Sequence, residues 1–131
     1  MSEFVLVGAI GVSGVRHEFQ AYPVGTHFLP NPGVYAFCWH APNGQWNTLY
    51  IGETDSFYRR LTAELTAHHQ YERATTLGLS HIAVLHVPGD RGERLSIETD
   101  LRHALSPPCN DQPIPVGDAL RGMTGFGFGR R

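Results

Sequence analysis

The chain has 131 residues and a formal net charge of −2 at pH 7, with 17% charged and 41% hydrophobic residues. This length fits one domain with a modest core, and the composition is typical of a globular protein rather than a disordered chain. No apolar run approaches the length of a membrane span and no signal-peptide pattern opens the chain, so we expect a soluble, cytoplasmic protein.

The basic side chains are all arginine, since none of the 10 Lys+Arg positions is a lysine. Arginine makes bidentate contacts with phosphate, although a biased genome composition would produce the same pattern. The acidic balance argues against a sequence-independent DNA clamp, which usually carries a basic excess. Cys38 and Cys109 are too few for a disulfide framework, and no Cys/His cluster has the spacing of a zinc site.

Strand-like and helix-like patterns alternate along the chain. We expect strands over 4–10, 15–22, 33–41, 46–51 and 81–87. We expect helices over 55–69, 71–77 and 93–105. The order hairpin, hairpin, helix, short helix, strand, helix predicts an α+β fold. Its expected architecture is a small, mainly antiparallel three-stranded sheet flanked by helices, with an added N-terminal β-hairpin.

Three segments are expected from the distribution of turn residues. Residues 1–32 form the N-terminal hairpin and a proline-rich linker, residues 33–110 form the principal domain, and residues 111–131 form a C-terminal tail rich in Gly and Pro. The N-terminal hairpin is expected to add to one edge of the main sheet.

The second hairpin brings two tyrosines close together if its register is as the pattern indicates. If Ala41 lies opposite Trp46, then Phe37 lies opposite Tyr50, and Tyr35 and Tyr50 share one face as diagonal neighbours. A slip of one residue would place them on opposite faces. The tyrosine pair is therefore a prediction that depends on register.

The stretch LYIGETDSFYRRL, residues 49–61, joins the end of a strand to the start of a helix. Gly52 suits a strand end where another group comes close, and Thr54 and Asp55 are both suitable helix N-caps. The stretch places the Tyr50 hydroxyl and the Arg60 guanidinium near one edge of the sheet. This combination is typical of a phosphate site rather than of ordinary packing.

Hydrolysis of a phosphodiester needs a base for water, a cation for the phosphate and help for the leaving oxygen. Tyrosine, arginine and a single carboxylate that holds one divalent ion with waters could supply these. Taken singly, each residue also has an ordinary explanation. A strand tyrosine usually packs, Arg60 with Glu64 is usually a solvated pair, Glu98 is usually a surface residue, and Asn110 is usually a turn residue. These patterns alone predict a small domain that binds an anion.

The ordered set of GVY at 33–35, LYIG at 49–52, RRL at 59–61 and a Glu-to-Asn segment at 98–110 that ends in PPCN resembles the GIY-YIG nuclease domain. The resemblance covers residues 33–110. It implies a divalent-metal-dependent endonuclease that hydrolyses phosphodiester bonds in DNA, with water attacking in line and Mg²⁺ or Mn²⁺ as cofactor.

The resemblance also implies a role for each matching residue. Tyr35 and Tyr50 line the site, with Tyr50 as the general base. Arg60 binds the scissile phosphate, Glu98 holds the single metal ion, and Asn110 fixes the geometry by hydrogen bonds.

Further positions complete this comparison. Arg59 is expected to join Arg60 in binding DNA, and Gly33 and Gly52 are expected to shape the strand ends. Many members carry His or Tyr one helical turn after the arginine, where this chain has Glu64. His68 and His69 lie a further turn along and are not assigned that role.

Two alternatives stay open on the sequence. The first is a catalytically inactive module of the same kind that binds nucleic acid. The second is a protein-interaction domain that uses the N-terminal hairpin or the tail. A homodimer and a separate specificity partner are also open, and an exposed sheet edge would allow dimerisation.

Overall fold

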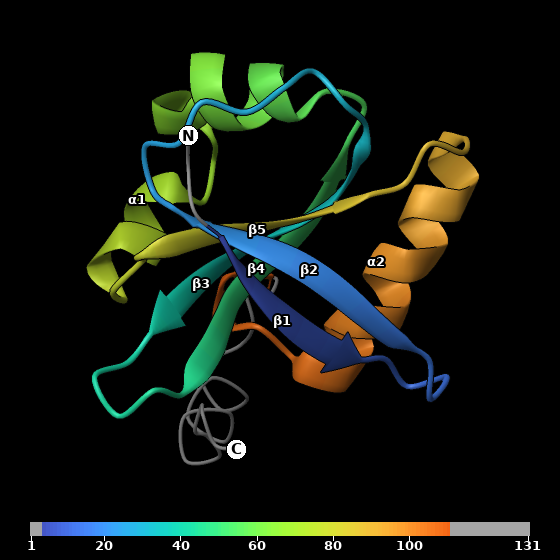
Figure 1. Ribbon diagram of the computed structural model, residues 1–131, viewed down its shortest axis with the longest axis horizontal. Coiled ribbons are helices and arrows are strands. Elements are labelled where there is room, and N and C mark those ends of the chain that lie inside the picture. The colour runs from blue at the N-terminus through green and yellow to red at the C-terminus, as the bar shows by residue number, and fades with distance from the viewer. Residues whose placement is uncertain (1–3, 111–131) are drawn as a thin grey trace, which may run out of the picture.

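The computed structural model describes residues 4–110 (Figure 1), so the predicted C-terminal tail lies outside the described residues. The strands are β1 (Val5–Ile10), β2 (Arg16–Pro23), β3 (Gly33–His40), β4 (Trp46–Thr54) and β5 (His81–His86). The helical elements are a π-helical turn (Arg59–Ala63), a 3₁₀ turn (Leu65–Ala67), α1 (Tyr71–Thr76), α2 (Arg91–Leu105) and a second 3₁₀ turn (Pro108–Asn110).

The prediction of a three-stranded sheet flanked by helices is wrong. Five antiparallel strands form one curled sheet in the order β1-β2-β5-β3-β4, and the fold is mostly β (Figure 1). Among the helical elements in the described part of the chain, only α2 is longer than six residues. The N-terminal hairpin is thus part of this one sheet. Hydropathy patterns identify strands but not their distant partners, and β2 pairs with β5 across most of the described chain.

The sheet is covered on both faces. On one face Leu101 of α2 packs in a cluster of buried strand residues that include Ala21, Val34, Ile51 and Ala83. On the other face the segment 24–32 and the helical segment 57–79 cover an apolar cluster. This second cluster contains Phe28, Tyr35, Phe37, Phe57, Leu61, Leu65 and Ile82. The tyrosine of β3 therefore belongs to a packed layer and not to an open surface.

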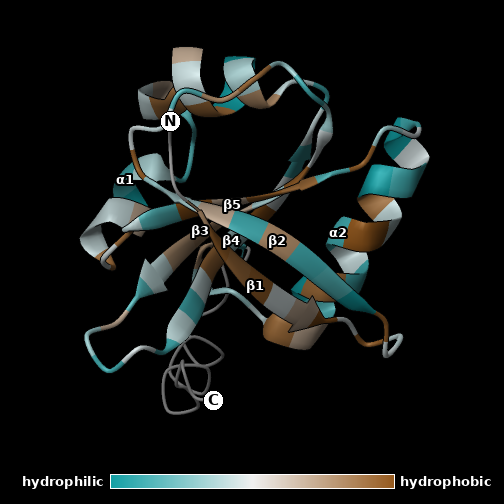
Figure 2. Ribbon diagram, viewed as in Figure 1, coloured by the Kyte–Doolittle hydropathy of each residue, from teal (hydrophilic) through white to brown (hydrophobic). Residues whose placement is uncertain are grey.

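Strand β1 is apolar along most of its length (Figure 2) and has a free edge. Val5, Leu6 and Ile10 are each about half exposed there. No helix within residues 4–110 has the length and apolarity needed to cross a bilayer.

The single helix expected over 55–69 is wrong, although its apolar stripe of Phe57, Leu61 and Leu65 is buried as predicted. The chain is π-helical over Arg59–Ala63, and Glu64 then leaves the helical region with φ −118° and ψ 24°. A short 3₁₀ turn follows, and His68 adopts an extended backbone with φ −63° and ψ 131°. Tertiary contacts override the helical pattern, since the Thr62 hydroxyl accepts a hydrogen bond from the Phe28 N–H and His68 packs into the core.

The residue that caps the start of the helical segment also differs from the predicted N-caps, Thr54 and Asp55. The Ser56 hydroxyl, not Thr54 or Asp55, accepts a hydrogen bond from the Arg59 N–H at 3.1 Å. The Thr54 hydroxyl instead accepts from the Ser56 N–H, which tightens the turn after β4. Asp55 forms an ion pair with Arg59 four residues later. The turn between β4 and the π-helical turn is therefore held by short-range interactions of the Thr54, Asp55 and Ser56 side chains.

Candidate active site

The register of the second hairpin is as predicted at the tyrosines. Phe37 lies opposite Tyr50 and Tyr35 opposite Gly52. A bulge after Phe37 shifts the far end by one residue, so His40 rather than Ala41 faces Trp46. The rings of Tyr35 and Tyr50 share one face with their centroids 6.0 Å apart. The two hydroxyl groups therefore belong to one site beside the free edge of β4.

Two glycines make room for this arrangement. A Cβ atom on Gly52 would lie 2.7 Å from the Tyr35 hydroxyl oxygen and 2.9 Å from Cε2 of Tyr50. A Cβ atom on Gly33 would lie 2.1 Å from the Leu85 carbonyl oxygen. All three distances are too short for a real side chain, so each glycine is required for close approach at a strand end.

His68 is a site residue that the sequence did not identify. Its side chain is buried, and Nε2 lies 2.7 Å from the Tyr35 hydroxyl oxygen. Its ring also packs edge-on against Tyr50 and stacks on His69. Burial, with smaller contributions from the charges of Arg60 and His69, lowers the pKa of His68 to about 3. The imidazole is therefore neutral at physiological pH.

The helix break explains why this histidine could not be predicted. On a continuous helix His68 would lie roughly 12 Å along the axis from Arg60, because each residue adds about 1.5 Å. The departure of Glu64 from helical geometry instead turns the chain inward and brings His68 to Tyr35. The pattern contains only a weak signal, a histidine on the same predicted stripe as Arg60. Glu64 itself is exposed.

Arg60 reaches the tyrosines from the π-helical turn. Its Nε donates to the Tyr35 hydroxyl oxygen at 3.4 Å, and one of its terminal nitrogens lies 3.2 Å from Nδ1 of His69. Within residues 4–110 no ion pair joins Arg60 to a carboxylate, although part of its side chain is buried. Its charge is therefore available to an incoming anion. Arg59, in contrast, is exposed and paired with Asp55.

Asn110 fixes the edge strand beside this cluster. Its Oδ1 accepts a hydrogen bond from the Ile51 N–H, and its Nδ2 donates to the Ile51 carbonyl oxygen, both at 2.8 Å. One side chain thus satisfies both backbone groups that Ile51 presents at the free edge of β4. These contacts fix the backbone of β4 next to Tyr50, and the role of Asn110 in a catalytic site stays a prediction.

We expect Asn110→Ala to lower the free energy of unfolding by about 1–3 kcal/mol, because it leaves the Ile51 backbone groups without these partners. The local signature is faster hydrogen exchange of the Ile51 amide, measured by NMR. Exchange at Ala83, in the centre of the sheet, serves as the internal control. Unchanged protection of Ile51 would contradict the structural role given to Asn110.

Glu98 approaches from the opposite layer. It lies on α2, its side chain is partly buried, and its charge is close enough to Tyr50 to raise the pKa of that hydroxyl. Burial raises the pKa of Glu98, while Arg102 lowers it and Glu53 raises it further. In the described part of the chain Glu98 makes no ion pair, whereas Glu53 is paired with Arg91 and Arg94.

Burial also changes the pKa of both tyrosines. It raises the pKa of Tyr35 and of Tyr50, and Tyr35 is the more deeply buried of the two. The charge of Arg60, the neighbouring Tyr35 hydroxyl and the charge of Arg102 each lower the pKa of Tyr50. Of the two tyrosines, Tyr50 is therefore the one that is partly exposed to solvent, and the nearby arginine charges favour loss of its proton.

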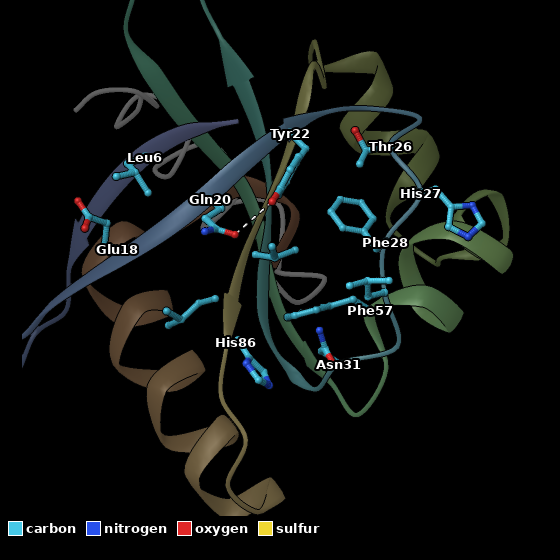
Figure 3. A pocket seen from close by; sticks show the side chains of 13 residues that line it. Leu6, Glu18, Gln20, Tyr22, Thr26, His27, Phe28, Asn31, Phe57 and His86 are labelled. Carbon is cyan, nitrogen blue, oxygen red and sulfur yellow. Dashed lines mark hydrogen bonds between the residues drawn. The ribbon is translucent and has the colours of Figure 1, made fainter. Parts of the chain in front are cut away.

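A groove of 670 Å³ lies elsewhere, against β2 and β5 (Figure 3). Tyr22, Phe28 and Phe57 are among the aromatic residues that line it, and the Tyr22 hydroxyl donates to the Gln20 side chain at 3.2 Å. The described residues along its walls include none of the site residues above. The groove is therefore separate from the tyrosine cluster.

Comparison of the chain with protein-family models, curated proteins and solved structures found no match. The resemblance to the GIY-YIG nucleases therefore stays a prediction. A proposal about function depends on that resemblance and on the geometry of the site.

Proposed function

We propose that this chain is a divalent-metal-dependent endonuclease that hydrolyses phosphodiester bonds in DNA, as its resemblance to the GIY-YIG nucleases implies. The observation that carries the proposal is the convergence of Tyr35, Tyr50, His68 and Arg60 from four different segments. A half-buried arginine without a carboxylate partner, beside two hydroxyl groups, suits a phosphate better than it suits packing.

Tyr50 acts as the general base in this proposal. Its hydroxyl is partly open to solvent, so a water molecule can reach it, whereas the Tyr35 side chain is only 1% exposed. The charge of Arg60 favours the ionised form of Tyr50, and the neighbouring Tyr35 hydroxyl acts in the same direction. Tyr35 thus assists and Tyr50 takes the proton from the attacking water.

Arg60 binds the phosphate. Its planar fork can donate two parallel hydrogen bonds to phosphate oxygens, and its charge offsets the negative charge that builds up as water attacks. Arg59 lies outside this cluster and contributes at most to contacts with the DNA backbone, since it is exposed and already paired.

Glu98 would hold the divalent ion. No group of three His, Cys, Asp or Glu residues suitable for a metal occurs within residues 4–110. The donor set nevertheless fits Mg²⁺ or Mn²⁺, since Mg²⁺ is usually bound by one or two carboxylates, several waters and substrate phosphates. Glu98 is a partly buried carboxylate without an ion pair, and a bound cation would stabilise its charge. When bound, the ion would stabilise charge on the leaving oxygen.

Replacement of Arg60 by alanine tests the phosphate site. We expect nicking of supercoiled plasmid to fall about 100-fold, because one preorganised donor to the developing charge is lost. DNA affinity in a gel shift should fall about tenfold, the value of a hydrogen bond to a charged group. Arg59→Ala is the matched control, and we expect a change of less than about threefold because surface pairs contribute little. Equal losses in the two variants would contradict the assignment of Arg60.

A second candidate is a module that binds nucleic acid without cutting it. It is favoured by the raised pKa of both tyrosines, since a base that stays protonated does not activate water. A gel shift that depends on Arg60, in the absence of metal-dependent nicking at any pH between 7 and 9, would select this candidate.

A further inference from the structure

A buried ion pair joins α2 to the end of β4 that lies beside the site. Glu53 directly follows Gly52, and its Oε1 accepts a hydrogen bond from Nε of Arg94 at 2.9 Å. Its Oε2 accepts a hydrogen bond from Nε of Arg91 at 3.2 Å. The side chains of Glu53 and Arg94 are only 13% and 9% exposed, whereas that of Arg91 is 71% exposed. The buried link between helix and strand is therefore the one that Arg94 makes.

Arg94 has a second partner in the loop before α2. One of its terminal nitrogens donates to the Gly89 carbonyl oxygen at 3.2 Å. The guanidinium thus links α2 to β4 and also to the loop that follows β5. A buried ion pair adds little net stability, because the cost of removing two charges from water is close to their mutual attraction. Its effect here is geometric, since hydrogen bonds in two directions restrict where α2 can lie on β4.

Glu98 lies one helical turn beyond Arg94, about 6 Å along the axis and on the same face of α2. Beyond Glu98 the helix has a second polar anchor at Asp100. This carboxylate accepts hydrogen bonds from the backbone N–H and the hydroxyl of Ser13, at 2.8 and 2.7 Å. Ser13 lies in the turn between β1 and β2, so the two anchors reach opposite edges of the sheet, with Glu98 between them.

The two anchors differ in what they can fix. The Asp100 contact attaches α2 to the hairpin at the β1 edge, which is the far edge from Tyr50. The Arg94 contact attaches the helix to β4, the strand that carries Tyr50. Loss of the Arg94 contact would therefore change the separation of Glu98 from Tyr50 while Asp100 keeps the helix on the sheet.

We propose that Arg94 is a positioning residue that holds α2 against β4 and so keeps the Glu98 carboxylate at a fixed separation from Tyr50. Its ion pair also engages Glu53, the neighbouring carboxylate on β4. The inference rests on the proposed function in that Glu98 is the metal ligand there, but the placement of Glu98 can be measured without any activity.

The first test compares crystal structures of the parent and of Arg94→Met, superposed on the five strands. We expect the Glu98 carboxylate of the variant to be displaced relative to the Tyr50 ring by about 1 Å or more, the misplacement that costs about 100-fold in rate. Arg91→Met is the matched control, since it also loses a hydrogen bond to Glu53 but at an exposed position, and its Glu98 should not move. Superposable Glu98 carboxylates in the parent and Arg94→Met would overturn the proposal.

The second test uses the same variants in plasmid nicking. Arg94→Met should lower kcat about 100-fold at nearly constant KM for DNA, and it should need more Mg²⁺ for its half-maximal rate. Arg94→Lys keeps a cation and an N–H donor for Glu53, so we expect it to recover about tenfold of that loss, the value of a hydrogen bond to a charged group. Arg91→Met should change kcat by less than about threefold, because exposed pairs contribute little.

A double variant separates positioning from folding. Removal of Arg94 alone leaves the half-buried Glu53 with only its exposed partner, which destabilises a protein. Glu53→Leu combined with Arg94→Met leaves no buried charge unpaired, so its thermal unfolding should be close to that of the parent. We expect this stable protein to keep the low kcat of Arg94→Met. Parent kcat in the double variant would overturn the role of Arg94.

The outcomes distinguish this inference from the proposed function. Equal kcat values for Arg94→Met and the parent would overturn the role of Arg94 and leave the nuclease proposal standing. If the parent itself does not cut DNA, the proposed function fails, and the crystal structures still decide whether Arg94 places Glu98. If Arg94→Met does not fold, the double variant takes its place in both tests.

Discussion

Tyr50→Phe is expected to lower the nicking rate on the order of 1,000-fold, within the range that a positioned general base supplies. The change removes a single oxygen atom. The ring, which contacts Tyr35, Phe37, His68 and His69, remains in place, so the packing of this layer should be preserved. DNA affinity should change by less than about threefold, because the hydroxyl of a base contributes mainly in the transition state.

The pH dependence gives this prediction a definite sign. The pKa of Tyr50 is raised above its ordinary value of 10.0, so the phenolate is the minor form at neutral pH. Its fraction grows about tenfold for each pH unit below the pKa, and the parent rate should rise between pH 7 and 9 with that slope. The residual rate of Tyr50→Phe should not. Tyr58→Phe, at an exposed tyrosine in the next segment, is the control. A Tyr50→Phe protein with the parent rate and slope would exclude Tyr50 as the base.

Glu98→Gln is expected to abolish metal-dependent nicking, with a loss on the order of 1,000-fold, because a metal ion at a phosphoryl oxygen is worth several kcal/mol. DNA binding in a gel shift without added metal should be nearly unchanged. The variant should also fold at least as well as the parent. The pKa of Glu98 is raised by burial, so the folded state disfavours the ionised carboxylate, and a neutral amide removes that cost at pH 7.

The combination of lost activity and retained stability distinguishes a metal ligand from a structural residue. Nicking is measured against added Mg²⁺ and Mn²⁺, and stability by thermal unfolding of the full chain. Glu93→Gln is the matched control, since Glu93 is an exposed glutamate on the same helix. Nicking by Glu98→Gln at the parent rate would show that the metal site lies elsewhere.

Sequence patterns could predict the parts of the site that depend on local alternation. The strand alternation of 33–41 and the return strand gave the pairing of Phe37 with Tyr50, although the bulge after Phe37 could not be anticipated. Gly52 was identified as a position of close approach, and the structure places both tyrosine rings against it. These features depend on residues that are close in sequence.

The parts that could not be predicted depend on distant contacts. Strand β2 pairs with β5, with Ala21 opposite Ala83, and nothing in its own sequence specifies that partner. The position of His68 depends on the backbone of Glu64, which ends the helix although its apolar stripe continues to Leu65. Local propensity is a weak guide wherever tertiary packing decides the backbone.

The most direct test of the nuclease site is incubation of supercoiled plasmid with the full-length chain, with Mg²⁺ or Mn²⁺ in one series and a chelator in the other. The account predicts conversion to nicked circles only in the metal series, at a rate that rises with pH from 7 to 9. Absence of nicking in both series, with DNA still bound in a gel shift, would contradict hydrolysis by the cluster of Tyr35, Tyr50, Arg60 and Glu98.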